Sequence, residues 1–170
     1  MNAITQRLLQ LRAKDIMSNN VVVVTANSTM SEAADVLSEH QISGAPVVDE
    51  LGHCVGVLSG TDYVHRKASH LEPDTGHILS MHTPAGWCQI EDVLNDLVRR
   101  HMTPAVQTID QNTSLLQVSR CMCAEHLHRL IVIDDNSVPV GVVTSLDLVA
   151  AIVNATDEQL QTLTREEPVS

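Results

Sequence analysis

Aromatic residues are nearly absent from this sequence, which has one tryptophan, one tyrosine and no phenylalanine. Because proteins that bind single-stranded nucleic acids stack bases on aromatic side chains, this scarcity argues against such a partner. The formal net charge of −11 argues the same way, since an acidic surface repels nucleic-acid phosphates and anionic membranes. The core must consist of Val, Leu, Ile, Ala and Met, as in small, tightly packed α/β units, and we predict no nucleic-acid partner.

Cysteines and long apolar runs are also few. Four cysteines among 170 residues are too sparse for a disulfide scaffold. No apolar run approaches the ~20 residues that a membrane-spanning helix needs, and the first residues lack the basic start and apolar stretch of a signal peptide. We therefore expect a cytoplasmic protein with no membrane partner, made of one compact domain or two small ones. With scattered glycines, no phosphate-gripping loop and no nucleophile–base pair, the sequence predicts no enzyme and no required cofactor.

The chain does contain an internal repeat. Residues 55–62 (VGVLSGTD) and 140–147 (VGVVTSLD) share the pattern of an apolar strand that turns into a helix, with a hydroxyl and a carboxylate at the turn. The two stretches lie 85 positions apart, and at this offset residues 16–64 align with the second half without a gap. Such small units cannot each bury an apolar face alone, so we expect the two copies to pack together.

Each copy is predicted to hold three strands and two helices in the same order. Ser28 or Thr29 is expected to cap the first helix of the first copy, with Glu32 in its first turn. The expected strands span residues 21–24, 45–48, 54–59, 106–109, 130–133 and 138–144. The expected helices span residues 3–12, 29–40 and 91–100, with others that start near residues 61, 114 and 145, the last of them reaching about residue 153 or beyond.

Further motifs accompany the repeated turns. Residues 15–17 (DIM) and 100–103 (RHMT) precede the first strands, and residues 42–49 (ISGAPVVD) correspond to residues 127–134 (LHRLIVID). With the two Gly-x-x-Ser/Thr-x-x-Asp turns, these motifs resemble the cystathionine-β-synthase (CBS) domain pair, or Bateman module. We divide the chain into a leading helix (1–12), a first repeat (13–68), an insert or linker (69–97), a second repeat (98–155), and a helix end with its tail (156–170).

The resemblance implies an α/β (α+β) fold. Each repeat would have a small three-stranded sheet with two helices, and the two repeats would pack with pseudo-twofold symmetry. It further implies clefts between the repeats that bind adenosine-containing ligands such as AMP, ADP, ATP or S-adenosylmethionine, and a homodimer. On this basis we expect a regulatory module that signals to an unknown regulated protein.

The repeated turns supply the first candidate ligand-binding residues. Asp62 and Asp147 each follow a hydroxyl residue, Ser59 or Thr144, by three positions. A carboxylate there can accept hydrogen bonds from both hydroxyls of a ribose, and the Ser or Thr hydroxyl can add a bond to ribose or phosphate. The alternative is that these residues cap the following helices, and both roles can coexist.

Other candidates flank the strand before each turn. His128 and Arg129 occupy places where the first copy has Ser43 and Gly44. The second copy locally resembles the γ subunit of AMP-activated protein kinase, in which a His-Arg pair here meets nucleotide phosphates. The planar fork of arginine suits phosphate; the alternative is a surface pair bonded to a local acid such as Glu125.

Ser43, Ala45 and Pro46 are predicted to line the first-copy cleft, where small residues let an adenine approach the backbone. Alternatively, they form the tight entry to a buried strand. A metal- or redox-responsive scaffold remains a different possibility, because residues 121–128 (CMCAEHLH) contain thiols and imidazoles. Cys121 and Cys123 would point about 200° apart on a helix, however, so we assign no metal ligand. A third possibility is a pure interaction module with degenerate clefts.

Overall fold

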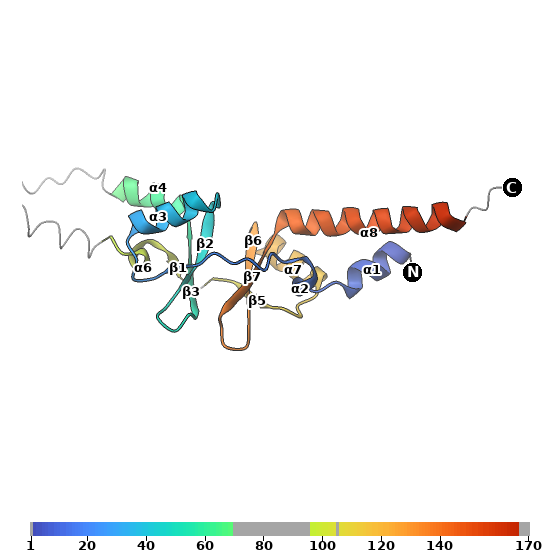
Figure 1. The fold of residues 1–170 in the computed structure, drawn as a ribbon, viewed down its shortest axis with the longest axis horizontal. Coiled ribbons are helices and arrows are strands. Elements are labelled where there is room, and N and C mark those ends of the chain that lie inside the picture. The colour runs from blue at the N-terminus through green and yellow to red at the C-terminus, as the bar shows by residue number, and fades with distance from the viewer. Residues whose placement is uncertain (1, 70–95, 105, 167–170) are drawn as a thin grey trace, which may run out of the picture. The chain divides into compact units, whose positions relative to one another are not determined.

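The computed structural model describes residues 2–69, 96–104 and 106–166. The chain divides into two compact units. Residues 22–106 form the first-copy unit, and residues 1–21 together with 107–170 form the second-copy unit. Each is described by itself, and Figure 1 labels their elements.

The first-copy unit is a four-stranded sheet with helices. Its sheet order is β1-β2-β3-β4, with β1 parallel to β2 and the other neighbours antiparallel. The strands are β1 (Val24–Thr25), β2 (Gly44–Val48), β3 (Cys54–Ser59) and β4 (Thr103–Pro104), and the helices are α3 (Met30–Glu39), α4 (Gly60–Ser69) and α6 (Val98–His101).

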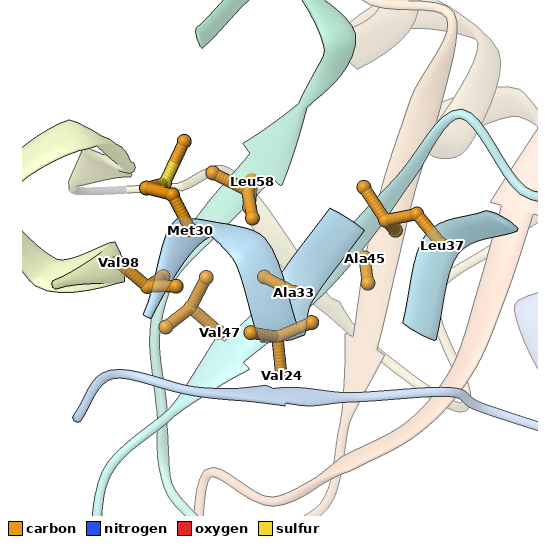
Figure 2. Packing of buried hydrophobic residues seen from close by; sticks show 8 residues of the cluster. All are labelled: Val24, Met30, Ala33, Leu37, Ala45, Val47, Leu58 and Val98. Atoms are coloured by element: carbon orange, nitrogen blue, oxygen red, sulfur yellow. The ribbon is translucent and has the colours of Figure 1, made fainter. Parts of the chain in front are cut away.

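The core of the first-copy unit lies between α3 and the sheet. Met30, Ala33 and Leu37 recur at helical spacing on α3 and are buried. They form one cluster with Val47 of β2 and Leu58 of β3, and Figure 2 shows Met30 beside Leu58 and Leu37 beside Ala45. Alternation along β2 and β3 turns the side chains of Val47 and Leu58 to one face of the sheet, and their burial fixes the register between these strands.

The start of α3 follows the sequence prediction. Thr29 is the N-cap, and its hydroxyl accepts a hydrogen bond from the Glu32 backbone N–H at 3.2 Å. The Glu32 carboxylate accepts in return from the Thr29 backbone N–H at 2.8 Å. This reciprocal pair is a capping box, and it satisfies N–H groups that have no partner inside the helix.

The second-copy unit repeats the arrangement with a three-stranded sheet, β5-β6-β7, in which β5 and β6 are parallel and β7 is antiparallel. Its core contains Val118 and Met122 from α7, Leu130 from β6 and Val143 from β7. The strands are β5 (Thr108–Asp110), β6 (Arg129–Ile133) and β7 (Pro139–Thr144), and the helices are α1 (Ala3–Gln10), α2 (Ala13–Ile16), α7 (Leu115–Ala124) and α8 (Ser145–Glu166).

The first residues of each repeat pack in the unit that holds the rest of the other repeat. Ser18 exchanges backbone hydrogen bonds with Val142 of β7, at 3.0 and 3.1 Å. Thr103 of β4 is likewise paired with Val57 of β3. The boundaries drawn from the repeat, at 13–68 and 98–155, therefore mark sequence periods, whereas the packing units exchange their leading segments.

The α/β fold class, with a small sheet and helices in each copy, is confirmed. The strand expected over residues 21–24 is much shorter, because only its last residue enters β1, which ends at Thr25. The strand expected over 106–109 begins two residues later, as β5. Of the helix expected over 91–100, residues 91–95 lie outside the described residues, and α6 begins at Val98. Within the described ranges, no helix combines the length and apolarity needed to cross a membrane.

Candidate ligand-binding turns

The repeated turn of the second copy holds its carboxylate in a fixed position. Thr144 ends β7, and α8 begins at the next residue. The backbone N–H and the hydroxyl of Thr144 donate to Asp147 Oδ2 at 2.6 and 2.7 Å. The Asp147 N–H donates back to the Thr144 hydroxyl at 3.4 Å. The helix-capping role considered from the sequence is therefore present, with Thr144 and Asp147 acting as a pair.

The first copy has the same turn. The backbone N–H and hydroxyl of Ser59 donate to Asp62 Oδ2 at 2.6 and 2.8 Å. A further hydroxyl, that of Thr103, donates to Asp62 Oδ1 at 3.2 Å. Sequence reasoning missed Thr103. Its repeat partner is Ser18, another hydroxyl residue, which forms an isolated bridge with Val142 of β7, and this correspondence is the signal that could have found it.

Capping uses one oxygen of the Asp147 carboxylate and leaves the other available. Among the residues that the structure describes, none donates a hydrogen bond to Asp147 Oδ1. The side chain is half-buried, so this oxygen is held beside the turn and is not freely rotating in solvent. A carboxylate oxygen with a fixed direction can accept a hydrogen bond from a ligand hydroxyl at little entropic cost.

The structure places His128 and Arg129 at the same turn. Arg129 lies directly opposite Thr144 in the β6–β7 register. The backbone carbonyl of His128 accepts a hydrogen bond from the Ser145 N–H at 3.0 Å. Opposed residues of an antiparallel pair project from one face of the sheet, so the Arg129 and Thr144 side chains share a face. The His128 side chain is exposed and that of Arg129 is half-buried.

The three small residues predicted in the first copy have different environments. Ser43 is exposed, and its carbonyl accepts from the Gly60 N–H at 3.1 Å, which places it beside the Ser59 turn. Ala45 is 2% exposed, and its side chain lies in the core beneath α3 (Figure 2). Pro46 is buried in the middle of β2, opposite Val57. Any ligand contact at Ala45 is therefore restricted to its backbone.

The thiol–imidazole tract does not form a metal centre in the described part of the chain. Cys121 packs against the second-copy core, whereas Cys123 is exposed. No group of three His, Cys, Asp or Glu side chains within the described ranges could hold a metal ion. Three histidines of the insert, at positions 70, 77 and 82, lie outside the described residues.

Groups with displaced pKa values lie away from the repeated turns, and Asp134 and Cys54 are two of them. Hydrogen bonds from backbone N–H groups, first that of Val138, lower the pKa of Asp134 in the loop between β6 and β7. Partial burial raises the pKa of the Cys54 thiol at the start of β3, which makes it a poor thiolate nucleophile. Neither group lies at a repeated turn.

The chain thus holds two small sheets, and a carboxylate-bearing turn follows β3 in one and β7 in the other. The family model described as "CBS domain" matches residues 13–69 and 92–154, so the chain belongs to the CBS domain family. It is 28% identical over 153 residues to the protein MJ1426 of Methanocaldococcus jannaschii, covering 82% of this chain and 90% of that protein.

Solved structures agree with the fold. The structure of CBSX2 in complex with AMP superposes with a TM-score of 0.67 at 23% identity, covering 85% of this chain and 98% of that one. The CBS domain pair of protein MJ0100, solved with 5′-methylthioadenosine and S-adenosylmethionine, gives a TM-score of 0.63 at 25% identity over 82% of this chain and 98% of that one. CBS domain pairs similar to this chain thus bind adenosine-containing ligands.

Proposed function

We propose that this protein is a regulatory module that binds an adenosine-containing ligand at its repeated turns, with the second-copy turn as the stronger site. The observation that carries the proposal is the Asp147 carboxylate, whose Oδ2 is fixed by Thr144 while its Oδ1 remains open among the described residues. The adenosine ligand of the MJ0100 pair supports the ligand class.

The ribose is the part of the ligand that Asp147 suits. Its vicinal hydroxyls are donors, and a carboxylate is an acceptor without donors of its own. Charge-assisted hydrogen bonds of this kind are stronger than those between neutral groups. The capping bonds from Thr144 hold the acceptor in place before the ligand arrives.

Arg129 and His128 suit an anionic group on the same ligand. Arginine donates in pairs to phosphate oxygens, and Arg129 lies across the sheet from Thr144. The chain holds only ten lysines and arginines against twenty-one acidic residues, so a dense polyphosphate clamp is not expected. A modestly charged ligand such as AMP or ADP fits this balance better than ATP.

Calorimetric titration with AMP, ADP, ATP and S-adenosylmethionine tests the proposal. The informative variant is Asp147→Asn, because the amide oxygen can still accept the capping bond while the second acceptor becomes a donor. We expect its affinity to fall about tenfold or more. Asp157→Asn, an exposed change further along α8, is the control and should bind as the unchanged protein does. No heat and no thermal shift with any of the four ligands would refute adenosine binding and favour a pure interaction module.

We further propose that α8 carries the homodimer surface through which occupancy is signalled. Leu146, Val149, Val153 and Leu160 recur along α8 at intervals of three, four and seven, and each is between 51% and 73% exposed. This spacing forms one apolar stripe along a helix, and such a stripe is typical of helix pairing between subunits. A ligand would act by favouring one arrangement of the module over another through differential affinity.

A further inference from the structure

The two carboxylates of the repeated turns differ in their hydrogen bonds. In both copies Oδ2 accepts from the capping residue, at 2.6 Å from the backbone N–H. In the first copy Oδ1 also accepts, from the Thr103 hydroxyl at 3.2 Å. No described residue does the same for Asp147. The acceptor capacity of Asp62 is therefore more fully used within the protein than that of Asp147.

The difference originates at one pair of equivalent positions. Thr103 pairs with Val57 beside the first-copy turn, and Ser18 pairs with Val142 beside the second-copy turn. Each residue carries a hydroxyl, but within the described chain Ser18 makes no bond to Asp147. The β-carbon branch of threonine restricts its χ1 angle more than serine's is restricted, so the Thr103 hydroxyl loses less freedom by pointing at Asp62.

We propose that Thr103 determines the order in which the two turns take ligand. Its hydroxyl occupies the Asp62 oxygen that a ribose hydroxyl would otherwise use, so the first-copy turn binds an adenosine ligand more weakly than the second-copy turn. This inference rests on the proposed function. A ribose at Asp62 has to displace or share the Thr103 bond, whereas a ribose at Asp147 meets an open oxygen.

The variant that tests this is Thr103→Val, which removes the hydroxyl and keeps a branched side chain suited to a strand. The probe is adenosine, because it lacks phosphate and therefore reports the ribose contact without His128 or Arg129. Calorimetry of Thr103→Val should show the weaker site tightened about threefold to tenfold, the net size of one ordinary hydrogen bond, or a second site where one was measurable before. Asp62→Asn added to this variant should abolish the gain.

Three matched variants complete the experiment. Ser18→Ala at the equivalent position should leave both sites unchanged, and Thr103→Ser, which keeps the hydroxyl but frees its χ1 angle, should tighten the weaker site less than Thr103→Val does. Thr103→Ala is a second variant without the hydroxyl, in case Val disturbs folding as judged by denaturation.

The possible outcomes separate the two proposals. Adenosine binding that is identical in the unchanged protein and in both hydroxyl-free variants overturns the role of Thr103 and leaves the proposed function standing. A gain confined to the site that Asp147→Asn removes also overturns it. Absence of adenosine and AMP binding in every protein refutes the proposed function, and this inference with it.

Discussion

Met17 lies against Gly141 so closely that a methyl group on the glycine would overlap the methionine Sδ and lie 2.8 Å from its Cγ. The same contact occurs in the other unit, where a Cβ on Gly56 would lie 2.6 Å from Met102 Sδ and 2.9 Å from the Thr103 carbonyl oxygen. The glycine of each repeated turn motif thus makes room for a methionine from the first residues of the other repeat.

This contact predicts a specific loss of stability. Gly141→Ala forces Met17 out of its place, so we expect destabilisation of about 1–3 kcal/mol, the usual cost of overpacking. Chemical denaturation measures it. The double variant Gly141→Ala with Met17→Ala should lose less stability than the sum of the losses of the two single variants, because the shortened side chain makes room for the new methyl group. Strictly additive costs would show that the two residues do not share this contact. Gly52→Ala is unsuitable as a control, because Gly52 has a positive φ of 87°.

A second prediction concerns acid stability. The pKa of Asp134 is lowered in the folded state by backbone N–H donors, chiefly that of Val138. A group with a depressed folded pKa stabilises the protein above its unfolded pKa, and that contribution is lost as the pH falls through the folded pKa. For Asp134 the loss begins below the ordinary value of 3.8. We expect Asp134→Asn, which keeps an acceptor for the loop, to flatten the decrease of stability below that pH in denaturation series. An unchanged slope would exclude Asp134 as a contributor.

The third prediction separates phosphate recognition from ribose recognition. Arg129→Gln removes the positive charge opposite Thr144 but keeps a side chain able to donate hydrogen bonds. AMP affinity should fall about tenfold, and adenosine affinity should stay nearly constant. The difference between the two ligands should also shrink as salt is raised, because exposed charge pairs are screened. Equal losses of affinity for AMP and adenosine would show that Arg129 supports the structure of the site and does not contact the phosphate.

The fourth prediction addresses the α8 stripe. Val153→Glu puts a charge in the middle of the exposed apolar positions, so the protein should become monomeric in size-exclusion chromatography with light scattering. Gln161→Glu, at an exposed position of α8 outside the stripe, adds the same charge and should leave the assembly intact. If the unchanged protein is itself a monomer at high concentration, the stripe has another role.

Local features of the fold were predictable from the sequence because they depend on neighbouring residues. The capping box at Thr29 requires only a hydroxyl and an acid three positions apart, and the β3 and β7 turns repeat that logic with Ser59 and Thr144. The helical spacing of Met30, Ala33 and Leu37 likewise predicted which face of α3 is buried.

Features that depend on distant residues were not predictable in this way. The segment around Ser18 packs in the unit of the second copy. The repeat, with its offset of 85 residues, would look the same if this segment packed on its own copy, so the sequence could not reveal the exchange of leading segments. The alternation that turns Ala45 toward the core depends on the register of β2 against β3, which a short apolar run leaves open. The Thr103–Asp62 bond joins residues 41 positions apart, and only the pairing of β4 with β3 brings them together.

The exchanged leading segments bear on how such a chain could have arisen. A single-copy ancestor with this architecture would have left its own sheet without the strand-pairing segment and the methionine that packs against the glycine. Two ancestral molecules could each have supplied that segment to the other, which is a domain-swapped dimer. Cutting the chain within the insert would not release two autonomous halves. Each half would carry the leading segment that packs in the unit of the other half.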